Sequence, residues 1–166
     1  MDLLRACKGT DFIGDPDAQD LHTYINEEKT AALNAEERYK KFNEWLDREG
    51  VLRPGVKYPV AFGKRGQLIG MAASKDLPPE TAFLAVPNHL HINAHTIRKR
   101  APHIWEIYKK HPEVFKKHYD AEYLVLIVYV WHEQLKGADS FFHPFFQIIN
   151  YSDLPFTWEA SELAAF

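Results

Sequence analysis

Cysteines are nearly absent from this sequence, and so are long apolar runs. Its 166 residues include one cysteine, Cys7, so no disulfide can form within the chain and a reducing compartment is expected. The longest apolar run, 123–131, is far shorter than the roughly 20 residues that a membrane span needs. The first ten residues carry Asp2, Arg5 and Lys8 and lack the apolar core of a signal peptide. We expect an intracellular protein, cytoplasmic or nuclear, with no membrane partner.

A basic excess is also missing. The formal net charge is -3, and nucleic acid is therefore disfavoured as the main partner, because phosphate binding needs a basic field. The basic cluster 98–100 is interpreted as the solvated end of a helix. What the chain does have is 46% hydrophobic, 26% charged and 14% aromatic residues. This composition and length favour one compact folded domain with an aromatic core or interface.

Hydrophobic spacing predicts a helix near the N-terminus. Asn34 with Glu37 three residues later resembles a capping box, and Gly50 is a typical stop signal. Four apolar residues share one face at helical spacing, which predicts core packing; they are Tyr39, Phe42, Trp45 and Leu46.

The middle of the chain predicts strands and the remainder predicts helices, which makes the fold class α+β. Three short apolar runs separated by turns are expected to form a small, mainly antiparallel sheet; they are 58–62, 68–73 and 82–86. Helices are expected at 95–100, 104–110, 112–118 and 120–136, the last ending at Gly137. Because its middle, 123–131, is apolar all round, we expect that helix to be buried on most sides.

Several stretches, taken in order, resemble one family. The segment 67–77, Gln-Leu-Ile-Gly-Met-Ala-Ala-Ser-Lys-Asp-Leu, and then Phe-Leu-Ala-Val-Pro at 83–87 are similar to the opening of a SET domain. There a Gly-x-Gly turn precedes a strand, and a later strand ends in Val-Pro. Further stretches resemble the branch that includes the Rubisco large-subunit lysine methyltransferase and the actin-histidine methyltransferase; they are Leu90-x-Ile92, 123–135, 140–146 and 156–163. The resemblance runs from about residue 51 onward.

The resemblance implies a division of the chain. Residues 1–50 would be an N-terminal extension and helix, 51–97 the N-terminal SET strands, and 98–166 the first half of a helical insertion. It also implies binding of S-adenosylmethionine, mostly through main-chain groups, because a turn bracketed by glycines lets a ligand approach the backbone. Carried over by position, the cofactor contacts would come from Gln67, Leu68, Ile69 and Gly70.

The sequence departs from the family pattern in two turns. Leu68 stands where the first glycine is expected, and Glu80-Thr81 stands where the family usually has Gly-Glu or Asn-Glu. Either Leu68 takes a positive φ and narrows the cofactor cleft, or Gly66 supplies the flexible position and Leu68 points into the core. We favour the second, because a strand tolerates leucine far better than a turn with positive φ does.

No catalytic residue is expected in this chain. In the family an Asn-His pair and a catalytic Tyr complete the site beyond the helical insertion, and this sequence does not reach them. Tyr129 and Tyr151 lie outside the matching segment. The expected function is therefore the N-terminal part of a protein N-methyltransferase acting on lysine or histidine, not catalytic by itself.

One other interpretation of the function stays open. The domain could instead be a non-catalytic structural or binding subunit, which the altered glycine turn favours. In either case the partner would be a protein substrate, another subunit or a C-terminal segment. The spacing of His89, His91 and His95 resembles a zinc motif, but a site needs three or four converging ligands, and we expect no metal there.

Overall fold

The N-terminal half is built around an antiparallel hairpin. The computed structural model describes residues 24–66, 68–115 and 121–149, and in it β1 (Val56–Phe62) pairs with β2 (Leu68–Ala73). The register sets Phe62 opposite Leu68, and one irregularity lies between Lys57 and Val60. These two strands are the only sheet among the described residues. Both strands lie where the sequence predicts them.

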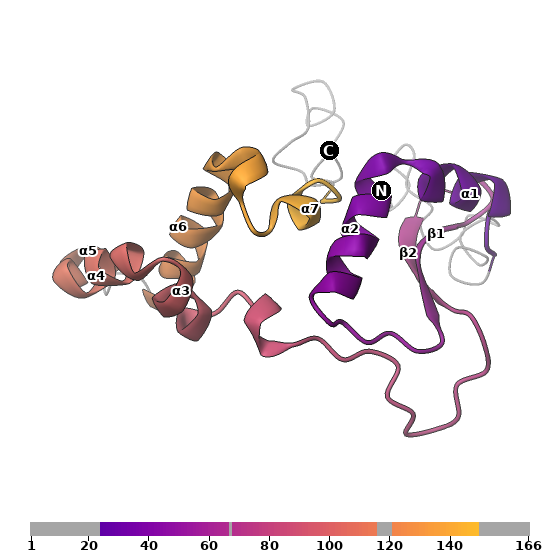
Figure 1. Cartoon of the computed structure of the whole chain (residues 1–166), viewed down its shortest axis with the longest axis horizontal. Coiled ribbons are helices and arrows are strands. Elements are labelled where there is room, and N and C mark those ends of the chain that lie inside the picture. Colours follow the sequence, from indigo (N-terminus) through magenta and orange to yellow (C-terminus); the bar gives the residue numbers. More distant parts are fainter. Residues whose placement is uncertain (1–23, 67, 116–120, 150–166) are drawn as a thin grey trace, which may run out of the picture.

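Two helices pack beside this hairpin, α1 (Glu27–Ala35) and α2 (Glu37–Arg48) (Figure 1). Asn26 starts α1, because its side chain accepts a hydrogen bond from the N–H of Lys29. Gly50, with φ +79°, follows the end of α2 in the left-handed conformation that closes many helices. The predicted apolar face of α2 is confirmed, with Tyr39, Phe42 and Trp45 buried.

The predicted start of this helix is wrong, and α1 was not predicted. Asn34 lies inside α1, where its amide donates to the carbonyls of Thr30 (2.8 Å) and Pro59 (3.0 Å). The actual N-cap of α2 is Glu36, which makes no side-chain capping bond. The amide of Asn34 thus joins α1 to β1, a tertiary contact that local spacing could not reveal.

The third predicted strand, 82–86, is also wrong. This part of the chain forms one isolated bridge, in which Leu52 and Ala85 exchange hydrogen bonds of 3.0 and 2.7 Å. Pro54 follows closely after Leu52 and interrupts the segment that would have to pair along the whole length. The arm from residue 74 to 87 therefore extends along the surface, with Phe83 and Leu84 exposed.

The second half consists of short helices, as expected. They are α3 (Ala94–Arg100), α4 (Pro102–Lys110), α5 (Pro112–Phe115), α6 (Ala121–Leu135) and α7 (His143–Phe146). A capping box of Asn93 and Thr96 starts α3, and prolines at the first positions start α4 and α5. The predicted end of the helix 112–118 and the predicted start of the helix 120–136 lie outside the described residues. The fold class α+β is confirmed.

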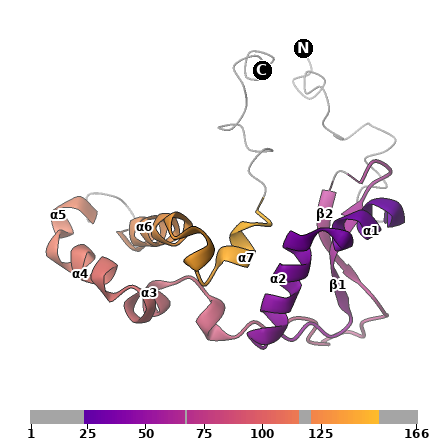
Figure 2. The ribbon, with the colours of Figure 1, turned by 45° about the horizontal axis from the view of Figure 1, so that its top comes forward.

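One apolar cluster connects the two halves. Figures 1 and 2 place α1, α2 and the hairpin on one side, α3 to α6 on the other and α7 between them. The buried residues of the cluster come from both sides; they include Phe42, Trp45, Val51, Ile97, Ile104, Val125, Tyr129 and Phe142. The halves therefore share their larger core, and a smaller cluster of Leu33, Tyr39 and Ala61 lies within the N-terminal half.

Only one face of α6 is covered by the described residues. Val125, Tyr129 and Glu133, spaced four apart, are buried, while Trp131 is 67% exposed and Leu135 is 89% exposed. The described residues therefore leave much of this helix uncovered, and its burial on most sides would need a segment or chain outside them. Its sequence is apolar on more sides than its neighbours cover.

We predict that Ile97→Ala costs about 2–5 kcal/mol of unfolding free energy, because it leaves a cavity in the shared core. Ile97 is fully buried in α3, whereas Ile107 in α4 is 51% exposed, so Ile107→Ala is a matched control. Urea unfolding of both variants measures the difference. Equal losses for the two would show that the core is not where the packing places it.

Candidate functional site

The residues implied by the resemblance lie in a strand. Leu68, Ile69 and Gly70 form the first half of β2, and Gln67 lies outside the described residues. The turn before them closes with the N–H of Gly66 donating to the carbonyl of Gly63 (2.9 Å). Both glycines have positive φ, +81° for Gly63 and +63° for Gly66. The flexible positions thus precede the segment expected to contact the cofactor.

The expectation for Leu68 is half right. Of the described non-glycine residues only Glu80 has a positive φ (+61°), so Leu68 keeps ordinary strand angles and Gly66 supplies the left-handed position. Leu68 is half-buried rather than in the core, and it lines an open hollow with Ile25 and Phe62. The closed-cleft alternative is rejected. The expectation that its side chain points into the core is wrong, because that side chain is only partly buried.

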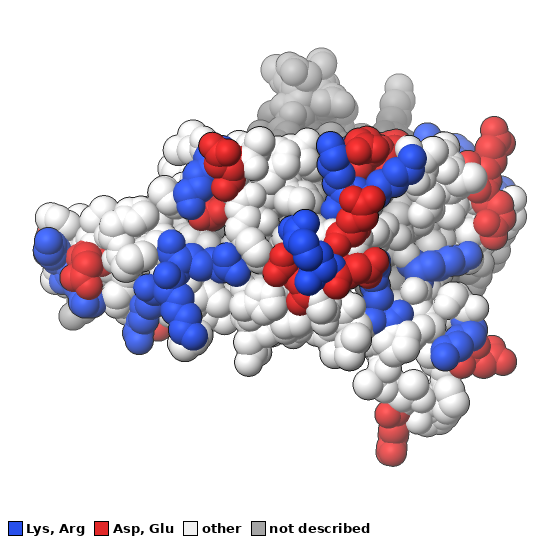
Figure 3. Space-filling view, in the orientation of Figure 1, with Lys and Arg blue, Asp and Glu red and all other residues white. Residues whose placement is uncertain are grey.

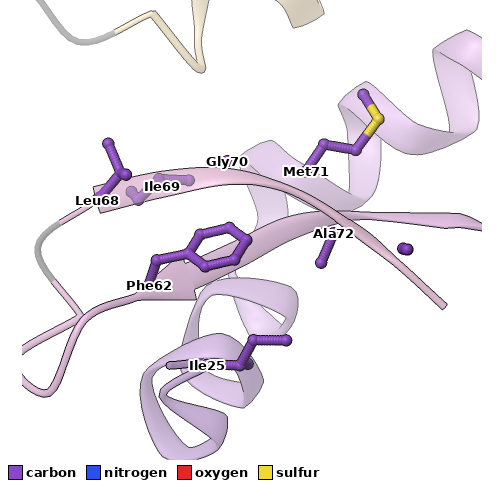
Figure 4. Close-up of a pocket in the computed structure, with 8 residues that line it drawn as sticks. Ile25, Phe62, Leu68, Ile69, Gly70, Met71 and Ala72 are labelled. Atoms are coloured by element: carbon purple, nitrogen blue, oxygen red, sulfur yellow. The ribbon is translucent and has the colours of Figure 1, made fainter. Parts of the chain in front are cut away.

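This hollow, of about 500 Å³, runs along the whole of β2 (Figure 4). Its lining consists of Ile25, Phe62 and residues 68–73. The ring of Phe62 lies over Gly70, where an added Cβ would come within 3.3 Å of its Cε2. Every lining side chain is apolar, so only main-chain groups can hydrogen-bond to a ligand there.

These residues do not fit S-adenosylmethionine by themselves. The cofactor carries an amino group, a carboxylate, a sulfonium and a ribose diol, and the described residues of the hollow offer no charged or polar side chain to any of them. Main-chain groups alone satisfy part of such a ligand. Within the same described lining there is no titratable side chain that could serve as an acid or base.

The phenols of Tyr58 and Tyr129 are poorly suited to proton transfer. Burial raises the pKa of Tyr58 to about 12 and that of Tyr129 to about 12, further from neutral pH than an ordinary phenol. The hydroxyl of Tyr129 is buried with no hydrogen-bond partner among the described residues. Both rings pack against other aromatic residues, which is a structural role.

A buried carboxylate lies outside the hollow, at the end of α6. Glu133 is 2% exposed; it receives hydrogen bonds from Lys136 Nζ (2.5 Å) and Ser140 Oγ (2.7 Å). Burial alone would raise the pKa of the Glu133 carboxyl, but the bonds from Lys136 and Ser140 outweigh burial and hold it below its usual range. Ser140 Oγ also accepts from the N–H of Phe142 (3.1 Å), so the carboxylate positions the chain that leads into α7.

The three spaced histidines do not converge. His89 lies in a short 3-10 turn, Asn88–Leu90, and its ring contacts Glu49 (3.2 Å). His91 ends that turn and His95 belongs to α3. Within the described ranges, no group of three or more His, Cys, Asp or Glu is positioned to hold a metal ion.

The basic cluster of α3 is partly engaged in stacking. The guanidinium of Arg98 lies 4.1 Å from the ring centre of Trp105, and that of Arg100 lies 3.7 Å from the ring centre of Phe141. Figure 3 shows cationic residues gathered over α3, whereas charges of both signs mix over α2. Two of these cations therefore pack on aromatic rings, which the interpretation as a simple solvated helix end did not foresee.

The hollow extends beyond the residues expected from the sequence. Met71, Ala72 and Ala73 continue the lining along β2, and Ile25 and Phe62 join it from outside that strand. Phe62 stands opposite Leu68, so the predicted hairpin register could have found it. Ile25 carried no signal, because its place depends on pairing with β1.

Comparison of the chain with models of protein families, with curated proteins and with solved structures gives no match. In the described part of the chain, no helix combines the length and apolar character that crossing a membrane requires.

We predict that Gly66→Ala is more destabilising than Gly50→Ala. Both glycines have positive φ, so each substitution carries a backbone cost of about 1 kcal/mol. Only at Gly66 would the new Cβ also collide, within 2.9 Å of Lys29 Cβ and Cγ, whereas nothing lies within 4 Å at Gly50. Thermal unfolding of both variants measures the difference, and an equal loss would contradict the tight contact between the turn and α1.

We predict that Glu133→Gln lowers stability at pH 7 by about 1.5–3 kcal/mol, the usual contribution of hydrogen bonds to a charged group. Because the folded-state pKa lies below the unfolded value, this contribution is complete above about pH 4.3 and disappears as pH falls through the folded-state pKa. Urea unfolding at several pH values between neutral and strongly acidic should show the two proteins converging. Exposed Glu106→Gln is the control, and a difference independent of pH would contradict the assignment.

Proposed function

We propose that this chain forms the N-terminal part of a SET-domain protein N-methyltransferase that uses S-adenosylmethionine as methyl donor. The acceptor would be a lysine or histidine of a protein substrate. The chain contributes strands and the beginning of a helical insertion, and is not catalytic by itself.

The observation that carries this proposal is the conformation of one turn. Glu80 has φ +61°, a conformation that favours glycine and asparagine. This is the position at which the resembled family usually carries Gly or Asn. A glutamate held there is explained if the backbone path of the family is kept after its usual residue has been replaced.

The order of elements gives further support. A hairpin whose turn has left-handed glycines is followed by the turn at Glu80, an extended arm ending at Pro87 and then helices. The resemblance implies this order, except that it expects a strand where the arm, 82–86, is extended with a single bridge to Leu52. The apolar lining along β2 supports a role for the main-chain groups of Ile69, which point away from β1, with other parts of the protein supplying the charged partners of the cofactor.

A second function is favoured by a different observation. The exposed apolar face of α6, which includes Trp131 and Leu135, suits a subunit that binds other proteins without catalysis. In that case Leu68 and Glu80 mark a site whose cofactor binding has been lost.

Calorimetry with S-adenosylmethionine tests the proposal. We predict no measurable heat for this chain alone, and for the protein made from the whole reading frame a dissociation constant in the micromolar range, about -8 kcal/mol. Micromolar binding by the chain alone would show that its own residues suffice. Absence of binding in both proteins would reject the cofactor and leave the non-catalytic subunit.

A further inference from the structure

The main-chain groups on the outer edge of β2, the edge that faces away from β1, can be assigned to particular residues. Ala61 of β1 turns its main chain away from β2, because its N–H donates to Thr30 Oγ1 (3.0 Å) and its carbonyl accepts from the N–H of Asn26 (2.9 Å). Ala61 stands opposite Ile69. Opposite residues in an antiparallel pair exchange both hydrogen bonds or neither. The N–H and C=O of Ile69 therefore point away from β1, and those of Met71 do the same.

The other end of β2 agrees with this direction. Ser74 donates to the carbonyl of Gly55 (2.8 Å), so Ser74 faces the β1 side and Ala73 faces outward. No strand among the described residues pairs with this edge. Natural proteins protect such edges with charges or proline, and β2 has neither. Ile69 and Met71 are 39% and 43% exposed.

A second hollow, of about 290 Å³, opens beside Met71. Its walls come from α2, β1 and the arm, and include Phe42, Leu46, Tyr58, Leu84 and Val86. Large apolar side chains thus surround a space beside an edge that offers main-chain donors and acceptors. The two features are what strand addition uses, with backbone bonds for affinity and a side-chain pocket for specificity.

Two cations border this second hollow, and only one is compensated. Arg53 donates to the side chains of Asn43 and Asp47, the latter at 2.6 Å. Lys57 is exposed and makes no ion pair within the described residues. An occupant with a carboxylate next to its apolar group would complete the charge of this surface.

We propose that the open edge of β2 binds an extended peptide of a partner protein as an additional strand. One large apolar side chain of that peptide fills the hollow beside Met71, and an adjacent acidic residue faces Lys57. A second copy of β2 does not meet this requirement, because residues 68–73 carry no acidic side chain. The proposal does not depend on methyl transfer, since it uses neither the cofactor nor a catalytic group.

The test uses a fluorescein-labelled peptide, Thr-Val-Thr-Phe-Asp-Val-Thr, and fluorescence polarisation with the whole chain. We expect saturable micromolar binding that weakens about tenfold when the peptide's Phe becomes Ala, because the pocket then loses its apolar contact. Replacing the Thr that precedes Phe by Pro should also weaken it, because one main-chain donor is removed.

Protein variants locate the binding site. Met71→Pro removes an outward N–H while leaving the pairing with β1 intact, and should weaken binding about tenfold. Leu84→Asp, in the wall of the hollow, should do the same. Leu135→Asp is the matched control, an equal change at an exposed leucine of α6, and should have no effect. Lys57→Glu should reverse the preference, so that a peptide with Lys in place of Asp binds better. Thermal melts identify any variant that fails to fold. If Met71→Pro fails to fold, Leu84→Asp and Lys57→Glu still test the proposal.

Three results would overturn the proposal. The first is no binding at about 1 mM peptide, weaker than any specific recognition of this size. The second is binding that neither Met71→Pro nor Leu84→Asp changes, which places it elsewhere. The third is a dimer, seen by sedimentation, that Met71→Pro dissociates, because the edge would then bind a second copy of this chain.

Discussion

The packing of Phe142 holds the two halves of this protein together. The side chain is 1% exposed and contacts the rings of Trp45 from α2 and Tyr129 from α6, with centres 6.2 and 6.4 Å apart. Its N–H is bound by Ser140, which in turn donates to the buried carboxylate of Glu133. A charged group and an aromatic cluster therefore fix the same short segment, and the shared core depends on both.

The two outer edges of the hairpin differ in their hydrogen bonding. Polar groups of α1 and the residues before it satisfy one edge of β1, through Thr30, Asn26 and Asn34. The opposite edge of the sheet, along β2, has no such partner among the described residues. Because main-chain groups left without partners are costly when buried, this edge must stay in water or be paired, and the apolar surface beside it favours pairing.

Local spacing in the sequence was enough for regular elements. The helical face of Tyr39, Phe42 and Trp45, the strands that became β1 and β2, and the left-handed Gly50 were all predictable, since each depends on neighbours a few residues away. The candidate site was predictable to the same extent, in that Gly66 rather than Leu68 supplies the positive φ.

Contacts between distant residues decided the rest. The sequence around Asn34 predicts a helix cap, but its side-chain amide donates to the carbonyl of Pro59, because α1 lies against β1. Among the described residues, the third apolar run, 82–86, pairs only through the bridge between Ala85 and Leu52, and it forms an exposed arm. Composition also set the apolar character of α6, but its neighbours determined which face is covered. The sequence by itself determined which segments coil or extend, through short-range sterics and hydrogen bonds. Only the tertiary structure decided which edges and faces stay open, because that depends on what packs against them.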